Sequence, residues 1–139
     1  MSQKVREVMT RDPLMVDINE TLTRAAQQMR DADVGALIVT HTDDVRGVVT
    51  DRDITVRGVA EQLDPSSARL ADIVTHDLVA VSPDDDVETA VELMRTHAVR
   101  RLPVLDGEQP VGMVSLGDLA MERDRDSALA QISAEEPNN

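Results

Sequence analysis

Two pairs of side chains, each a hydroxyl followed three positions later by an aspartate, have the chemistry and the spacing to hold a ligand. They are Thr50 with Asp53 and Ser115 with Asp118. In each pair the hydroxyl ends an apolar run and the aspartate falls in the first turn of a predicted helix. A carboxylate there can accept hydrogen bonds from the two hydroxyls of a ribose, while the hydroxyl and the free amides of the helix N-terminus can meet a phosphate. The alternative is that each aspartate only caps its helix, and the two roles can coexist.

Phosphate binding at such a site would also need cations close by. The candidates near the two pairs are Arg52, Arg100 and Arg101. Because the formal net charge is −13, the chain as a whole repels anions, so any positive potential must be concentrated locally. The alternative is that these arginines pair with the abundant acidic residues on the surface.

Composition excludes several classes of function. With 139 residues, 41% hydrophobic and 29% charged, the chain is long enough for one compact folded unit. Its acidity argues against nucleic-acid binding, which relies on many lysine and arginine contacts to phosphates. The absence of cysteine removes disulfides and thiolate metal sites, and the absence of aromatic residues means that a bound base would lie between aliphatic side chains. No segment reaches the length of a membrane span, so we expect a cytoplasmic protein without a membrane partner.

Other residues that could do chemistry have simpler interpretations. The three histidines, His41, His76 and His97, are widely spaced, so we predict no metal site. The run from Asp84 to Asp86 is better explained by acids favoured at a helix N-terminus than by a divalent cation. Met29 and Met94 are expected in the core. No spacing supports a catalytic triad, a phosphate-binding glycine loop or paired catalytic carboxylates, so we predict no catalytic residues and no enzymatic activity.

The elements that position these residues occur twice. At an offset of 65 residues, 8–54 aligns with 73–119 without a gap, and Thr10 matches Thr75. The chain is therefore a tandem duplication. We predict a first repeat at 1–62, a linker at 63–69, a second repeat at 70–126 and a C-terminal tail at 127–139, weakly helical at 128–132 and frayed after that.

Each repeat has the pattern of a β-α-β-β-α unit. A turn or short helix precedes a brief strand, and then a helix begins near Asn19 or near Pro83 and Asp84. Two strands joined by a tight turn follow, and a last helix begins after the hydroxyl residue. The apolar spacing i, i+3, i+4, i+7 predicts one buried face on the first long helix of each repeat. Those faces consist of Leu22, Ala25, Ala26 and Met29, and of Val87, Ala90, Val91 and Met94. The predicted segments are 5–9, 14–16, 36–40, 47–50 and, in the second copy, 70–74, 79–81, 102–105 and 112–115.

The duplicated motifs resemble a known family. The stretches Val8-Met9-Thr10, Gly47 to Ile54 and Gly112 to Leu119 look like CBS domains, and the resemblance covers roughly residues 4–122. Two copies resemble a CBS domain pair, or Bateman module, of the stand-alone type found in actinobacterial hypoxic-response proteins. The resemblance implies an α+β fold in which two tandem β-α-β-β-α repeats are related by pseudo-two-fold symmetry and the sheets are flanked by helices.

The resemblance also implies a function. Such a pair is a non-catalytic stress-response sensor that needs no cofactor and binds an adenosine-containing ligand such as AMP, ADP or ATP in clefts between the repeats. It implies a homodimer that signals through an unidentified protein partner. The alternative is a ligand-free structural or protein-interaction module acting through dimerisation, and an enzyme of nucleotide metabolism is the weakest interpretation. The implied contacts at one site are Thr10, Met15, Gly35, Ser115 and Asp118, those at the other are Thr75, Ala80, Arg100, Thr50 and Asp53, and the phosphate candidates are Arg52 and Arg101.

Overall fold

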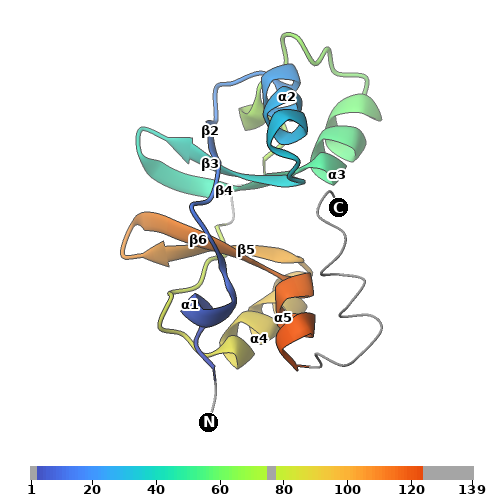
Figure 1. The fold of residues 1–139 in the computed structure, drawn as a ribbon. Coiled ribbons are helices and arrows are strands. Elements are labelled where there is room, and N and C mark those ends of the chain that lie inside the picture. The colour runs from blue at the N-terminus through green and yellow to red at the C-terminus, as the bar shows by residue number, and fades with distance from the viewer. Residues whose placement is uncertain (1–2, 75–77, 124–139) are drawn as a thin grey trace. The chain divides into compact units, whose positions relative to one another are not determined.

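The computed structural model describes residues 3–74 and 78–123, which divide into two compact units (Figure 1). Among the described residues, unit 1 consists of 3–13 and 79–123, and unit 2 consists of 14–74 and 78. Each unit therefore contains most of one sequence repeat together with the opening segment of the other. The predicted tail, including the weakly helical stretch at 128–132, lies outside the described residues.

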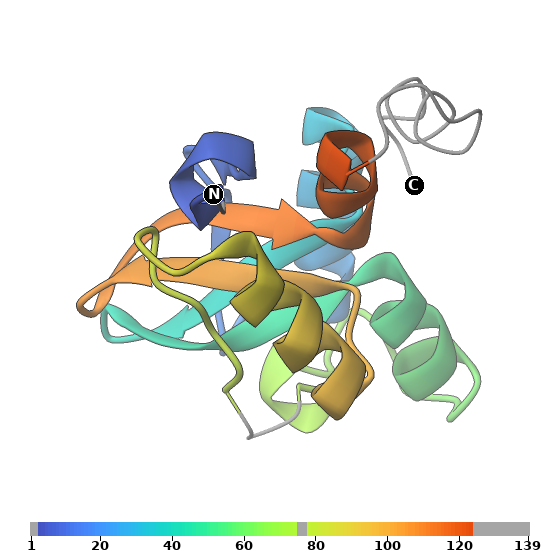
Figure 2. The same cartoon turned by 90° about the horizontal axis from the view of Figure 1, so that it is seen from below.

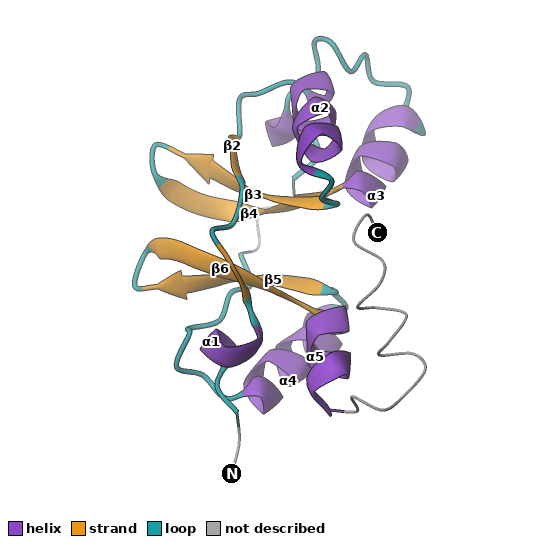
Figure 3. Cartoon of the chain, viewed as in Figure 1, coloured by secondary structure: helices purple, strands orange, loops and turns teal. Residues whose placement is uncertain are grey.

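Unit 2 is a three-stranded sheet with its helices on one face (Figure 3). The strand order is β2-β3-β4, in which β3 is parallel to β2 and antiparallel to β4. The last strand leads directly into α3, which continues as the π-helix η1. The elements are β2 (Met15–Asp17), α2 (Leu22–Ala32), β3 (Ala36–His41), β4 (Asp44–Thr50), α3 (Asp51–Asp53), η1 (Ile54–Val59) and the 3-10 helix η2 (Leu70–Asp72).

Unit 1 has the same hairpin but a different third strand. Its order is β1-β6-β5, and both pairings are antiparallel. Figure 2 shows α4 lying along this sheet, and in Figure 1 α1, α4 and α5 all lie on the same side of it. The predicted strand at 79–81 is reduced to a bridge between Val81 and Val104. The elements are α1 (Val5–Val8), β1 (Thr10–Arg11), α4 (Val87–His97), β5 (Arg101–Asp106), β6 (Gln109–Ser115) and α5 (Leu116–Arg123).

Each unit has its own hydrophobic core, and the helical periodicity of the sequence explains most of both. Leu22, Ala25 and Met29 of α2 are buried, and so are Val87, Ala90 and Met94 of α4. The core role predicted for the two methionines is therefore confirmed. Ala26 is predicted on the buried face but is exposed, because the apolar stripe of α2 is narrower than the residue spacing indicates. The predicted α+β class, with two sheets flanked by helices, is confirmed.

The two opening segments are exchanged between the repeats by matching backbone hydrogen bonds. In unit 1, Val5 N donates to Asp85 O at 2.9 Å, and in unit 2 the equivalent Leu70 N donates to Glu20 O at 2.9 Å. The next residue repeats the match: Arg6 N to Pro83 O and Ala71 N to Ile18 O are both 3.0 Å. Val5 and Leu70 are fully buried in the unit that receives them. Each repeat thus supplies a buried anchor to the core built mainly by the other.

Both long helices begin later than predicted. The N-caps are Thr21 and Asp86 rather than residues near Asn19 and Asp84. Thr21 accepts a hydrogen bond from Arg24 N, whereas the Asp86 side chain makes no capping bond. Instead Asp86 pairs with Lys4 at 2.8 Å. The acidic run does lie at the start of the helix, as predicted, but Asp86 pairs with a lysine beside α1 and its side chain makes no capping hydrogen bond.

The same two helices end alike. The C-cap residues, Asp33 and Ala98, have φ values of 55° and 54°, in the left-handed region. Such a conformation is costly for most residues other than glycine, although aspartate tolerates it better than alanine does. Among the described residues, no helix has both the length and the apolar character needed to cross a membrane.

Candidate functional site

The two hydroxyl and aspartate pairs form the same reciprocal hydrogen bonds. Thr50 N donates to Asp53 Oδ2 at 2.9 Å, and Asp53 N donates to Thr50 Oγ1 at 3.1 Å. In the other pair Ser115 N donates to Asp118 Oδ2 at 2.9 Å, and Asp118 N donates to Ser115 Oγ at 3.1 Å. These capping boxes fix both side chains at the start of α3 and of α5. Each box uses one carboxylate oxygen of its aspartate, so capping leaves the other to serve a different role.

The hairpins place a defined residue beside each pair. In unit 2, Ala36 faces Thr50 across β3 and β4, and Gly35 O accepts a hydrogen bond from Asp51 N at 3.0 Å. In unit 1, Arg101 faces Ser115 across β5 and β6, and Arg100 O accepts from Leu116 N at 2.8 Å. The backbone is therefore the same at both positions. The side chains differ, since unit 1 has two arginines where unit 2 has glycine and alanine.

Asp118 has an unusual electrostatic environment for a surface-helix aspartate. It is half-buried, and this burial raises the pKa of its carboxyl above the ordinary value because desolvation penalises the charged form. Hydrogen bonds from Ser115 and the nearby charge of Arg101 act in the opposite direction and lower the pKa, but burial dominates. A carboxylate held where charging it is unfavourable is a frequent property of functional sites.

The implied ligand contacts fall in both units. Thr10 lies on β1 and pairs with Met113 of β6, the strand that ends at Ser115, so unit 1 itself unites Thr10, Ser115 and Asp118. Thr10 comes from the first repeat and the other two from the second. Met15 and Gly35 of that predicted set belong to unit 2. Their role as ligand contacts stays a prediction.

The second predicted set is also divided. Thr50 and Asp53 are in unit 2, while Ala80 and Arg100 are in unit 1. Thr75 lies outside the described residues. Of the two phosphate candidates, Arg52 is exposed on α3 and Arg101 is half-buried. The sequence predicts that Arg101 lies near the motif and binds a phosphate. Its proximity to Asp118 depends on the pairing of β5 with β6, which the spacing of residues in the sequence does not reveal.

Metal-binding side chains do not converge in the described part of the chain. No group of three or more histidines, cysteines, aspartates or glutamates lies close enough to hold a metal ion within residues 3–74 and 78–123. His41 ends β3 and His97 ends α4, and both are exposed. The third histidine, His76, is outside the described residues.

Known proteins share both the duplication and the fold. The family model for the CBS domain matches twice, at residues 5–58 and 70–124. Hypoxic response protein 1 of Mycobacterium tuberculosis is 37% identical over 116 residues, which cover 83% of this chain and 81% of that protein.

Two solved structures have closely similar folds. The crystal structure of hypoxic response protein I with two coordinated zinc ions has a TM-score of 0.77 at 36% identity, covering 86% of this chain and 98% of that one. The CBS domain pair of protein MJ0100, in complex with 5′-methylthioadenosine and S-adenosylmethionine, has a TM-score of 0.81 at 18% identity, covering 91% and 100%. The second likeness concerns the fold alone.

The two matched segments follow the duplication seen in the residues, and each includes one of the reciprocally bonded pairs, Thr50 with Asp53 or Ser115 with Asp118. Together they account for most of the chain. The chain belongs to the CBS domain family, in which it is a tandem pair of the regulatory kind.

Proposed function

We propose that this CBS pair is a non-catalytic cytoplasmic sensor that binds an adenosine-containing ligand, with Asp118 and Asp53 each available to accept hydrogen bonds from a ribose. The observation that carries the proposal is the repetition of one hydrogen-bonded geometry. A hydroxyl and a carboxylate are held at a helix start with matching distances in both units, although the sequences around them differ. A purely local cap needs no such agreement, because many residue types cap helices.

The environment of Asp118 adds a second argument. Burial makes its charged form unfavourable in the protein alone, and ribose hydroxyls would supply hydrogen bonds that compensate that cost. Thr10 lies on the neighbouring strand opposite Met113, two residues before Ser115, and Arg101 faces Ser115 across the hairpin. A threonine hydroxyl, a carboxylate and a guanidinium together match the ribose and phosphate parts of AMP, ADP or ATP. The adenosine-type ligands of the MJ0100 domain pair agree with this choice.

The experiment is thermal unfolding followed by far-ultraviolet circular dichroism, since the chain has no aromatic residues for intrinsic fluorescence. The protein is heated with and without millimolar AMP, ADP, ATP and S-adenosylmethionine, and with GTP as a control. A ligand at ~100 times its Kd adds about 2.7 kcal/mol to the free energy of unfolding, which raises Tm by several degrees. We expect such a rise with at least one adenosine ligand.

Variants identify the site. Asp118→Asn and Asp53→Asn keep an oxygen that can accept the backbone N–H of the capping box but lose the carboxylate that would bind both ribose hydroxyls. We expect one or both to abolish the rise in Tm, and a dideoxyribose analogue of the ligand to cause no rise in the unsubstituted protein. Asp84→Asn is the matched control, because Asp84 is an exposed aspartate that pairs with Arg6 away from both capping boxes. No rise in Tm with any adenosine compound would contradict the proposal.

The output of a sensor without an attached effector requires a second molecule, and we propose a homodimer as the first such assembly. Val56 of η1 and Met121 of α5 occupy equivalent positions and are both apolar and exposed, at 44% and 38%. Val59 on η1 and Leu116 on α5 extend these exposed apolar positions. A second copy of the chain would remove them from water. Sedimentation equilibrium should give a dimer whose dissociation increases in Val56→Asp and Met121→Asp, whereas a monomer at micromolar concentration would contradict it.

The alternative is a module that works through protein contacts without any ligand. The exposed apolar side chains of η1 and α5 favour it as much as they favour a regulated dimer. A dimer that forms with the same affinity in the presence and absence of every adenosine compound tested, and shows no rise in Tm with them, would select this alternative.

A further inference from the structure

Unit 1 contains a hollow that is separate from the capping box of the same unit. Its volume is about 390 Å³, and every residue that lines it belongs to unit 1. This volume is in the range of pockets that hold small molecules, about 300–1,000 Å³. The hollow includes Pro110 and Val111 at the beginning of β6, whereas Ser115 ends that strand. Five residues of extended chain separate Pro110 from Ser115, or roughly 17 Å at about 3.3 Å per residue.

Part of the wall of the hollow is apolar and stiff. Three prolines contribute to it from three different segments, and Met9 and Val111 add apolar surface. The prolines are Pro13 after β1, Pro83 before α4 and Pro110 in β6. Because proline has a fixed φ, these segments lose little further freedom when a ligand binds, which favours affinity.

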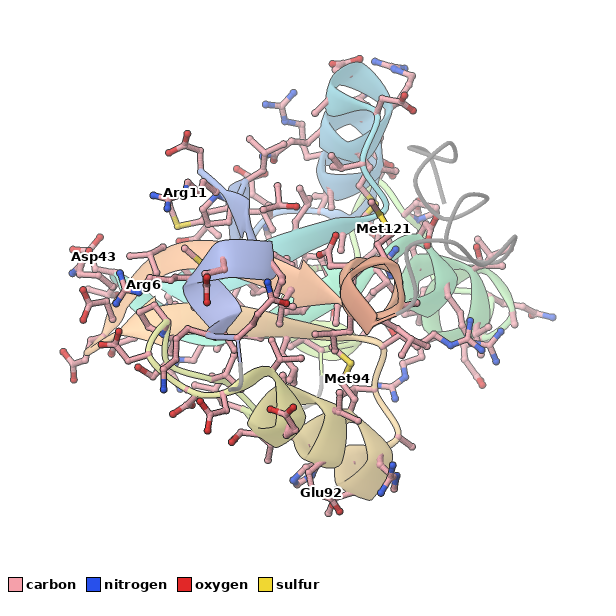
Figure 4. The ribbon with its side chains drawn as sticks, turned by 60° about the horizontal axis from the view of Figure 1, so that its bottom comes forward. Arg6, Arg11, Asp43, Glu92, Met94 and Met121 are labelled. Carbon is pink, nitrogen blue, oxygen red and sulfur yellow. The ribbon has the colours of Figure 1, made fainter. Side chains whose placement is uncertain are left out.

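Charged side chains of both signs also line the hollow. Arg6, on α1, is already held by an ion pair with Asp84. Arg11, Asp12 and Asp106 line it as well, and within residues 3–74 and 78–123 their side chains make no hydrogen bond or ion pair. Figure 4 shows Arg6 and Arg11 projecting to the same side of unit 1. One cation and two carboxylates in a single hollow are therefore free to contact a ligand.

We propose that this hollow binds a small apolar α-amino acid as its zwitterion. Arg11 pairs with the carboxylate of the amino acid, Asp106 and Asp12 accept hydrogen bonds from its ammonium group, and its side chain packs against the prolines. A simple anion is disfavoured, because the two aspartates would repel it. A simple cation leaves the guanidinium of Arg11 without a partner. A ligand that carries an ammonium and a carboxylate on the same carbon atom can satisfy all three side chains.

The corresponding positions of unit 2 differ. Asp106 is replaced by His41 and Pro110 by Val45 in the equivalent hairpin. The proposal therefore concerns unit 1 alone and does not depend on the adenosine ligand proposed above.

The test uses methionine methyl groups as reporters. The chain has seven methionines, of which Met9 lines the hollow and Met29 lies in the core of unit 2. With methyl-labelled methionine, L-leucine is titrated and the NMR signals are followed. We expect a saturable shift of the Met9 signal and a constant Met29 signal. Isocaproate and isoamylamine, which are leucine without its ammonium group and leucine without its carboxylate, should bind at least about tenfold more weakly, because each loses a charge-assisted contact.

Two substitutions localise the effect. Arg11→Ala and Asp106→Asn should each weaken leucine binding about tenfold or more. Both side chains are exposed, so neither change should unfold the protein. Arg46→Ala is the matched control, because Arg46 is an exposed arginine on β4 of unit 2. This variant should bind leucine with the same affinity as the unsubstituted protein. The proposal is overturned if leucine leaves the Met9 signal unchanged, if isocaproate binds as well as leucine, or if Arg11→Ala has no effect. None of these results affects the rise in Tm expected with adenosine ligands.

Discussion

The two units resemble each other far more closely in their backbone hydrogen bonds than in their side chains. The capping boxes agree in both distances, and the bonds that dock α1 and η2 agree in their partners. The side chains next to the boxes do not agree, because Arg101 in unit 1 replaces Ala36 in unit 2. After duplication, the framework was retained and the local electrostatics changed. Differences in ligand binding between the two positions should therefore arise from a few side chains and not from a difference in fold.

The largest expected effect compares the two docked opening segments. Leu70→Ala removes a fully buried side chain from the core of unit 2, and Val5→Ala removes a smaller one from the core of unit 1. We expect the free energy of unfolding to fall by about 3 kcal/mol for Leu70→Ala and by about 2 kcal/mol for Val5→Ala. Urea unfolding followed by circular dichroism measures both. If either loss is below about 0.5 kcal/mol, that opening segment does not contribute to its unit as the structure shows.

The next effect compares two glycines at close contacts. A Cβ on Gly112 would lie 2.6 Å from Met9 Sδ and 2.8 Å from Thr10 O, so Gly112→Ala must push the β1 backbone away from β6. A Cβ on Gly58 would lie 2.8 Å from Leu22 Cδ1, the end of a side chain that can shift. We expect losses of about 2 kcal/mol for Gly112→Ala and about 1 kcal/mol for Gly58→Ala in the same urea experiment. The reverse order would mean that β1 yields more easily than the core around Leu22.

A third comparison concerns the ends of α2 and α4. Ala98 is held at φ 54°, whereas the equivalent position in α2 is occupied by Asp33, which tolerates this conformation better. Ala98→Gly should therefore stabilise the protein by about 0.5–1 kcal/mol, seen as a higher urea midpoint with an unchanged slope. Ala98→Val is the control, since a β-branched residue at this φ should destabilise. A loss of stability in Ala98→Gly would show that the end of α4 is not strained.

The smallest effect is a dependence of stability on pH. Burial raises the folded-state pKa of Asp118 above its unfolded value, so the folded protein binds the proton more tightly. The contribution of this group is therefore most favourable at low pH, and stability is lost as pH rises from the ordinary carboxyl pKa through the raised one. Asp118→Asn should remove this loss, and so should have a higher Tm than the unsubstituted protein at neutral pH and nearly the same Tm in acid.

Arg101 supplies the matching test for that comparison. Its charge lowers the pKa of Asp118, so Arg101→Ala should raise that pKa further and make the loss of stability with rising pH larger. Thermal unfolding between acidic and neutral pH in both variants measures this. Equal pH dependence in the unsubstituted protein and in Asp118→Asn would contradict the burial of this carboxylate.

Local features of the fold could be predicted from the sequence, because local spacing determines them. The buried faces of α2 and α4 follow from apolar residues at helical intervals, and the capping boxes follow from a hydroxyl and an aspartate three positions apart. Ala26 shows the limit of this approach, since spacing alone does not give the width of the buried stripe.

The features that could not be predicted depend on contacts distant in sequence. The repeat shows that Val5 and Leu70 are equivalent, but not which copy of the fold receives each of them. The pairing of Asp86 with Lys4 joins residues far apart in the chain, so the spacing of the acidic run does not predict it. The position of Arg101 beside Asp118 likewise requires the pairing of β5 with β6. The sequence therefore predicts which residues form the candidate site, but not which side chains surround them.

The exchange of opening segments has a consequence for the ancestry of the chain. A protein made of a single repeat would have a core without its anchor, and an anchor without a core to receive it. Two molecules of that ancestor could satisfy each other, since each could donate its opening segment to its neighbour. Gene duplication and fusion would convert that mutual dependence between molecules into one within a single polypeptide. The two halves could then diverge, as Arg101 and Ala36 did, because one sequence no longer had to serve in both copies of the fold.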